Sequence, residues 1–217
     1  NRGFALLEAG DFAGAEAALT HVLTLDPSQA GAYSLRGTAR LNQRKSAEAI
    51  ADYKQAVALV PKNAPGHADL GFAQFYAGDY AGAASAFRTA TQLNKEMRFL
   101  LAWRLAAEIR SNSVELAAYQ SSIDKAPESR DWIDHLLLFQ LGRIDAQTLI
   151  HGVNKVEGQA RNQQLCEGYY FIGMELVRRN RNEDAQRYFE RAVQYQFPKL
   201  SAYRGARYAL GGSTVIR

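Results

Sequence analysis

The 217-residue chain has little sulfur and little proline: one cysteine (Cys166), two methionines and five prolines. A single cysteine excludes an internal disulfide and any metal site built from several thiolates. The sequence has no apolar run of the roughly 18 residues that a membrane-spanning helix needs. Scarce proline and abundant alanine favour closely packed helices, and the hydrophobic fraction of 47% is enough for a folded core.

Motifs of enzymatic sites are also missing. No glycine-rich phosphate loop is present, and Cys166 has Glu167 beside it but no nearby histidine to activate the thiol. The histidines stand outside any HExxH-like spacing, at His21, His67, His135 and His151. We therefore expect no catalytic residue, no cofactor and no metal site.

What the sequence does contain is a 34-residue period. Gly3, Gly37 and Gly71 are 34 positions apart, and Gly173 lies three further periods on. Each glycine is followed at fixed distances by a small and then a larger residue: Ala15 and Leu19, Ala49 and Tyr53, Ala83 and Phe87, Ala185 and Phe189. Pro27 and Pro61 close the first two copies. Several residue types in one register across four copies are typical of the tetratricopeptide repeat, a helix–turn–helix unit.

Each position has a steric reason. The glycine on the first helix and the alanine on the second let the two helices approach closely, and we expect the aromatic to fill the gap between one pair and the next. We predict an all-α, right-handed tetratricopeptide solenoid of about six helix pairs with a C-terminal capping helix. The residues expected at close helix crossings are Gly37, Ala49, Gly71, Ala83, Gly173 and Ala185.

The repeat pattern varies along the chain. Three repeats are expected within residues 1–96, two degenerate helix pairs within 97–162, and one repeat with the capping helix within 163–217, all in one continuous solenoid. The helices expected in the later part span 97–110, 114–125, 131–141, 146–156 and 199–210. Only two residues precede Gly3, so the first repeat is truncated and we expect the native polypeptide to extend upstream.

The first helix of each repeat lines the concave groove of such a solenoid. Because the glycine marks the core face, the positions three before it and one and five after it face the groove. Aromatic side chains there would be strong anchors for a partner, although packing against the neighbouring repeat is an alternative for each. Phe72 with Tyr76 is the leading pair. The predicted partner-binding residues are Phe4, Thr38, Asn42, Phe72, Phe75, Tyr76, Tyr170, Met174 and Arg178.

The groove lacks the basic residues with which some tetratricopeptide cochaperones hold an acidic peptide terminus. Ser34, Thr38 and Asp69 stand at those places, so we expect an apolar partner segment, or a part of the chain itself, in the groove. Residues 168–217 carry nine Lys/Arg against four Asp/Glu, within a net charge of +4 for the whole chain. This basic end is either a solvated arginine-rich face or a surface for an acidic partner, a nucleic acid or an anionic membrane surface. Beside Tyr170, Met174 and Arg178 it would suit a partner with an apolar segment flanked by acids.

From Leu101 onward the sequence carries a further pattern, which comprises Trp103, Trp132, residues 139–144 (FQLGRI), 147–149 (QTL), 167–173 (EGYYFIG) and 185–193. This pattern resembles the NlpI family of bacterial outer-membrane lipoproteins built of tetratricopeptide repeats. The resemblance implies a homodimeric adaptor that brings a periplasmic tail-specific protease to cell-wall hydrolases. The lipidated N-terminal cysteine of that family has no counterpart here, since Cys166 is internal.

Two functional hypotheses remain. The chain is either a free-standing adaptor or scaffold, or a regulatory repeat domain of a larger peptidase or transferase. We expect a protein or peptide partner, no nucleic acid, and membrane contact only through a lipid anchor upstream. Self-association is expected from the resemblance and from apolar residues in the weak repeats that need cover: Leu136, Leu137 and Phe139. The resemblance suggests the periplasm or outer membrane, with the cytoplasm as the alternative.

Overall fold

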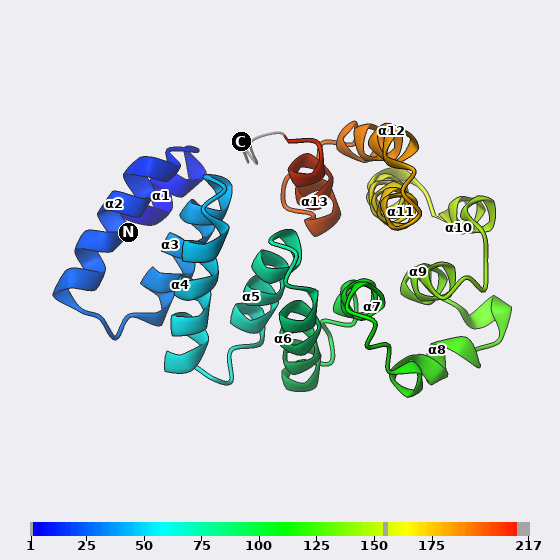
Figure 1. Cartoon of the computed structure of the whole chain (residues 1–217), viewed down its shortest axis with the longest axis horizontal. Coiled ribbons are helices and arrows are strands. Elements are labelled where there is room, and N and C mark those ends of the chain that lie inside the picture. The colour runs from blue at the N-terminus through cyan, green and yellow to red at the C-terminus, as the bar shows by residue number, and fades with distance from the viewer. Residues whose placement is uncertain (1, 154–155, 212–217) are drawn as a thin grey trace. The chain divides into compact units, whose positions relative to one another are not determined.

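The computed structural model describes residues 2–153 and 156–211. Every regular element in these ranges is helical, which confirms the all-α prediction (Figure 1). None of the described helices is both long and apolar enough to cross a bilayer. The elements are α1 (Arg2–Glu8), α2 (Phe12–Leu25), α3 (Ala30–Asn42), α4 (Ser46–Leu59), α5 (Ala64–Tyr76), α6 (Tyr80–Leu93), α7 (Leu100–Arg110), η1 (Leu116–Tyr119), α8 (Gln120–Ile123), η2 (Pro127–Ser129), α9 (Trp132–Gln140), α10 (Ala146–Gly152), α11 (Gly158–Arg178), α12 (Asn182–Val193) and α13 (Ser201–Ala209).

The chain forms two compact units. We call them the N-unit, described over residues 2–100, and the C-unit, described over 101–153 and 156–211. The N-unit holds the helix pairs α1/α2, α3/α4 and α5/α6, and the C-unit holds α7 to α13 apart from the first residue of α7. The finer division at residues 96 and 162 stays a prediction.

A residue in the left-handed backbone region ends the first helix of successive pairs. Gly10, Arg44 and Gly78 lie 34 positions apart, with φ of 78°, 61° and 84°. Asn112 and Asn180 continue the same phase, with φ of 53° and 59°. Glycine and asparagine adopt this conformation with little strain, whereas it costs other residues roughly 1–2 kcal/mol. The helix therefore breaks at Gly78 as the repeat requires, and the repeat phase persists into the degenerate pair after α7.

The repeat glycines make room for the large residue sixteen positions later. A Cβ on Gly71 would lie 2.6 Å from the Phe87 ring, and a Cβ on Gly173 would lie 2.6 Å from the Phe189 ring. The large residue thus fills, within its own helix pair, the space that the missing Cβ leaves. Tyr53 also belongs to a core cluster with Leu70 and Ala73 of the next pair, as expected. The expected burial is confirmed for Gly37, Ala49, Gly71, Ala83, Gly173 and Ala185.

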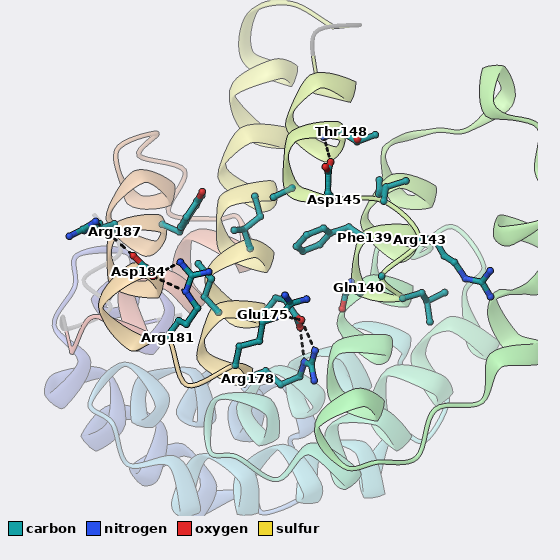
Figure 2. Close-up of a pocket in the computed structure, with 18 of the residues that line it drawn as sticks. Phe139, Gln140, Arg143, Asp145, Thr148, Glu175, Arg178, Arg181, Asp184 and Arg187 are labelled. Carbon is teal, nitrogen blue, oxygen red and sulfur yellow. Dashed lines mark hydrogen bonds and ion pairs between the residues drawn. The ribbon is translucent and has the colours of Figure 1, made fainter.

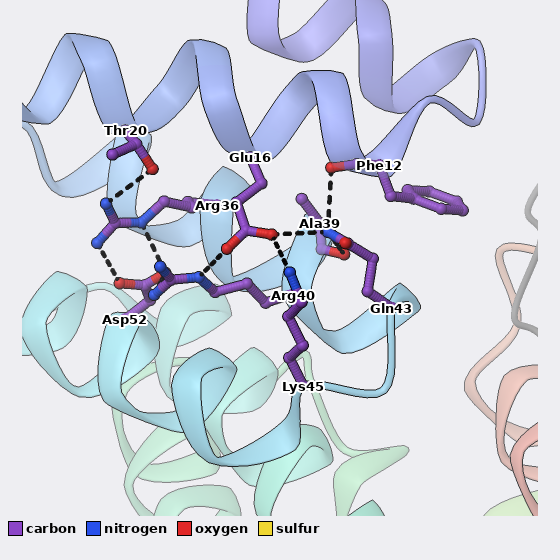
Figure 3. Close-up of polar contacts among 9 residues, drawn as sticks. All are labelled: Phe12, Glu16, Thr20, Arg36, Ala39, Arg40, Gln43, Lys45 and Asp52. Carbon is purple, nitrogen blue, oxygen red and sulfur yellow. Dashed lines mark hydrogen bonds and ion pairs between the residues drawn. The ribbon is translucent and has the colours of Figure 1, made fainter.

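A network of charged side chains joins the first helix pair of the N-unit to the second (Figure 3). Asp52, only 3% exposed, accepts hydrogen bonds from Arg36 Nη2 at 2.7 Å and Arg40 Nη1 at 2.9 Å. Glu16 accepts from Lys45 Nζ at 2.7 Å and Arg40 Nε at 2.9 Å. These bonds, led by that of Lys45, lower the pKa of Glu16 to about 2. Each buried charge in the network is therefore paired.

One period later the same positions carry no charge. Ile50, Leu70, Gln74 and Ala86 replace Glu16, Arg36, Arg40 and Asp52 in that order. Leu70 and Ala86 belong to an apolar cluster against which Ile50 packs. Equivalent positions of the repeat thus carry ion pairs at the first interface between helix pairs and uncharged, mostly apolar side chains at the second.

In the C-unit, a buried glutamate shapes the degenerate pair after α7. Glu108 is 0% exposed and accepts hydrogen bonds from Arg104 Nε at 2.7 Å, Tyr119 Oη at 2.9 Å and the backbone N–H of Glu115 at 3.3 Å. These bonds hold the following segment against α7 and take up a backbone donor near its start. The prediction of one continuous helix over residues 114–125 is wrong, because the short elements η1 and α8 stand in its place.

The next pair, α9/α10, is shorter than predicted. Its second helix ends at Gly152 and not at Val156, and residues 154–155 lie outside the described ranges. Leu136, Leu137 and Phe139 are 1%, 0% and 9% exposed. These side chains are already buried within the chain itself, so the expectation that they need a second copy of the chain to cover them is wrong.

Candidate binding surfaces and relation to known proteins

In the N-unit, two of the predicted groove aromatics are core residues. Phe72 is 6% exposed and packs edge-on against Phe87, with ring centroids 5.0 Å apart. Phe75 is 3% exposed and packs against Tyr80 at 5.3 Å. The expectation that these rings are at least partly exposed is wrong, because the helix pair closes around them.

Four other predicted groove residues of the N-unit differ in exposure. Phe4 is 52% exposed and Tyr76 is partly exposed beside Phe72. Thr38 and Asn42 are engaged inside the N-unit: Thr38 Oγ1 lies 2.9 Å from Tyr53 Oη, and Asn42 Nδ2 donates to the Thr38 carbonyl at 2.9 Å. Thr38 thus links α3 to α4, and Asn42 bonds within α3. Phe4 and Tyr76 remain the accessible candidates of the N-unit.

In the C-unit, Tyr170 is covered by the chain itself. Its ring is 2% exposed and stacks on Trp103, with centroids 5.1 Å apart and planes inclined by 30°. Helix α13 packs on α11 beside it, as expected of a capping helix. Further along α11, Met174 is partly exposed and Arg178 is exposed. Of these three predicted residues, Arg178 is the one whose side chain faces solvent.

A pocket of about 980 Å³ lies in the C-unit where α9 and α11 end and α10 and α12 begin (Figure 2). We call it the arginine pocket. Its apolar part includes Phe139, Ile172 and Leu176. Its cationic side chains are Arg143, Arg178, Arg179, Arg181, Arg187 and Arg191. Its carboxylates are Asp145, Glu175 and Asp184. Six guanidinium groups against three carboxylates leave the pocket with a positive charge.

Two arginines share each of two carboxylates in the pocket. Glu175 accepts from Arg178 Nη2 at 2.6 Å and Arg179 Nε at 2.7 Å. Burial acts to raise the pKa of Glu175, but these two hydrogen bonds outweigh it and hold the pKa below its ordinary value. Asp184 pairs with Arg181 at 2.6 Å and more distantly with Arg187 at 3.8 Å. Each shared carboxylate leaves guanidinium N–H donors for a ligand, because one guanidinium carries five.

The remaining charged side chains have other partners. Arg191 lies over the rings of Tyr169 and Tyr188, at 5.7 Å and 5.5 Å from their centroids. Asp145 caps α10 by accepting from the backbone N–H of Thr148 at 2.7 Å, and this bond lowers its pKa. In Figure 2, Arg143 lies on the opposite side of Phe139 from the group around Asp184. Positive charge therefore flanks the apolar part of the pocket on both sides.

Sequence reasoning found only part of this site. Arg178 is the one predicted binding residue that lines the pocket, although the excess of arginine in the C-terminal part of the chain was visible in the sequence. Phe139 and Arg143 were missed as binding residues because they come from another helix pair. In the sequence, residues 139–144 stand out for their family resemblance, and Phe139 as an apolar residue that needs cover.

The described residues contain no group of three or more histidine, cysteine, aspartate or glutamate side chains that could hold a metal ion. Cys166 is buried, and burial raises the pKa of its thiol to about 12, which keeps it protonated at neutral pH. A protonated, buried thiol is a poor nucleophile.

Family models of the tetratricopeptide repeat match residues 1–64 and 167–197. No curated protein sequence matches significantly. The solved structure of MamA is similar with a TM-score of 0.53 at 18% identity, over 92% of this chain and 96% of that chain. A tetratricopeptide repeat protein from Parabacteroides merdae has a TM-score of 0.50 at 16% identity, over 96% of each chain. The structure of Naa15/Naa10 bound to HypK-THB has a TM-score of 0.50 at 19% identity, over 97% of this chain and 33% of that chain.

Identities this low establish the fold alone. The matched ranges contain three of the four glycine positions of the 34-residue period, Gly3, Gly37 and Gly173, each with its large packing partner. The turn residues keep the same phase between the two matched ranges. The chain therefore has an all-α fold of the tetratricopeptide repeat type, and family models of that repeat match it over residues 1–64 and 167–197.

Proposed function

We propose that this chain is a non-catalytic protein-interaction scaffold that holds a segment of its partner in the arginine pocket. The pocket itself carries the proposal: it is open, combines apolar side chains with an excess of guanidinium groups over carboxylates, and is lined by the ends of four helices. Its volume of about 980 Å³ is near the upper end of ligand sites in proteins, which is enough for several residues of a peptide. Repeat proteins of this type generally act as interaction modules.

The test is site-specific photocrosslinking in cells of the source organism. A benzoylphenylalanine at Thr148, an exposed residue of the pocket, should give crosslinks to a discrete protein. The same group at Lys62, an exposed residue of the N-unit, is the matched control. Crosslinks at Thr148 that are absent at Lys62 and disappear with Arg187→Glu support the proposal. Identical patterns at both positions, or none at Thr148, would overturn it.

The finer proposal is an adaptor of the bacterial envelope that links a protease to its substrates. It is supported by the resemblance of residues 139–144, 147–149 and 167–173 to NlpI-type lipoproteins. Part of that resemblance, the Leu141-Gly142 and Thr148 positions, borders the arginine pocket. A homodimer, a lipid anchor upstream and a periplasmic or outer-membrane location belong to this proposal. Fractionation of cells that express the full-length gene tests it, because recovery in the cytosol contradicts an envelope adaptor.

A further inference from the structure

The arginine pocket has a chemistry that selects its ligand. Four of its arginines share Glu175 and Asp184 in two-to-one pairs, and Arg191 lies over the rings of Tyr169 and Tyr188. Arg187 is the least engaged of the four, with 75% of its side chain exposed. A ligand that brings carboxylates would complete these pairs, and hydrogen bonds between charged groups are the stronger kind.

Apolar side chains lie between the cations. Phe139, from the end of α9, and Ile172 and Leu176, from α11, line the pocket with the arginines around them. Phe139 and Ile172 are 9% and 4% exposed, so they form the floor and not a projecting surface. A matching ligand therefore places an apolar side chain at the centre and carboxylates on both sides of it.

The same features disfavour a nucleic acid. Asp145, Glu175 and Asp184 lie among the arginines and would repel a continuous row of phosphates. The ring of Tyr188, which a base would use for stacking, is already taken by Arg191. A protein segment, in contrast, can space its acids to avoid these carboxylates.

We propose that the arginine pocket binds an acidic segment of a partner protein in which aspartates or glutamates flank an apolar residue. This inference rests on the proposed scaffold function and specifies its ligand class.

The experiment measures binding of a fluorescent synthetic peptide in which leucines alternate with aspartates and glutamates. Its control is the same peptide with asparagine and glutamine in place of the acids. We expect the acidic peptide to bind at least about tenfold more tightly, since hydrogen bonds between charged groups are stronger than those between neutral groups. Affinity should fall as salt rises. Equal affinity for the two peptides would overturn the proposal.

Substitutions locate the binding. Arg187→Gln and Arg178→Gln should each weaken binding of the acidic peptide severalfold or more, whereas Lys62→Gln, which removes an exposed charge of the N-unit, should leave it unchanged. An equal loss in all three variants would show non-specific attraction and overturn the proposal. So would a single-stranded oligonucleotide that displaces the peptide and binds more tightly. If Thr148 crosslinks to a protein while the acidic peptide fails to bind, the ligand class is wrong and the scaffold function stands; if both fail, the function is wrong.

Discussion

The ring of Tyr170 lies directly against Gly205: a Cβ on Gly205 would be 2.7 Å from two carbons of that ring. The contact seats α13 on an aromatic residue that the repeat register assigns to the groove. In the C-unit, a helix of the chain itself therefore covers a position that the sequence suggested for a partner. The missing side chain of Gly205 is what permits this close approach.

Gly205→Val should displace α13 from Tyr170, because the added carbons have no space. Overpacking of this kind costs roughly 1–3 kcal/mol. Native-state hydrogen exchange should show faster exchange of the α13 amides while the amides of α2 to α6 are unaffected. Shrinking the opposing ring with Tyr170→Leu should restore part of the protection in the double variant. Unchanged exchange in Gly205→Val would show that α13 does not depend on this contact.

Gly71→Ala should also destabilise the protein, because its Cβ would lie 2.6 Å from the buried Phe87 ring. We expect a loss of about 1–3 kcal/mol in the free energy of unfolding, and a larger loss for Gly71→Leu. Gly31→Ala is the matched control, since a Cβ there meets nothing within 4 Å. It should be neutral or stabilise helix α3 by up to about 1 kcal/mol. Urea unfolding followed by circular dichroism measures both, and equal effects would contradict the packing role of Gly71.

Gly71 and Gly205 show which close helix contacts the sequence could and could not predict. Gly71 repeats with its period, so its place at a close helix crossing was readable. Gly205 falls outside the period, and nothing in the sequence indicated which residue it meets. Glu108 is a similar case, because a single glutamate gave no sign that it would be buried and would replace a helix by the η1–α8 segment. Periodic packing is predictable from one sequence, whereas contacts made once are not.

The ion-pair network between the first two helix pairs of the N-unit can be tested by replacing its residues with those that stand one period later. Asp52→Ala alone leaves Arg36 and Arg40 without their shared carboxylate and should cost roughly 2–4 kcal/mol. The fourfold variant Glu16→Ile, Arg36→Leu, Arg40→Gln and Asp52→Ala copies the next interface and should regain most of that loss or exceed the parent. Thermal unfolding by circular dichroism measures both variants. A fourfold variant less stable than Asp52→Ala would show that the two interfaces are not interchangeable.

Glu167 should make the protein less stable as the pH rises. Burial raises its pKa from the ordinary value of 4.5 to about 7, against the hydrogen bond that Trp132 Nε1 donates to its carboxylate. Between these values the native state keeps a proton that the unfolded chain has released, so stability falls from about pH 4.5 to about pH 7. Glu167→Gln should remove this slope and add roughly 1–3 kcal/mol above neutral pH, at about 1.4 kcal/mol for each pKa unit.

Urea midpoints measured over this pH range test the prediction for Glu167. Glu128→Gln, at an exposed residue of the same unit, is the control and should leave the slope as it is. If Glu167→Gln keeps the full pH dependence, the slope comes from other groups.

Self-association is the remaining prediction, and it now rests on the NlpI-like resemblance alone. Sedimentation equilibrium at micromolar concentration should show a species of twice the 24.0 kDa chain mass. A single species of the chain mass at all concentrations would reject a homodimer for residues 1–217.

The candidate site was less predictable than the fold. The repeat register identifies which positions face a groove, but it does not tell whether a ring there is open or closed over by its own helix pair. Phe72 and Phe75 are covered in this way, and Arg178 is not. The arginine pocket combines α9 with α12 across sequence positions that no periodicity links, so its outline required the structure.

Both tryptophans of the chain, Trp103 and Trp132, belong to the C-unit. Trp103 stacks on Tyr170, and Trp132 is hydrogen-bonded to Glu167. Intrinsic tryptophan emission therefore reports on one unit only, while far-ultraviolet dichroism reports on the helices of both. Recording the two signals in one denaturation series would reveal, without any label, whether the units melt together or in sequence.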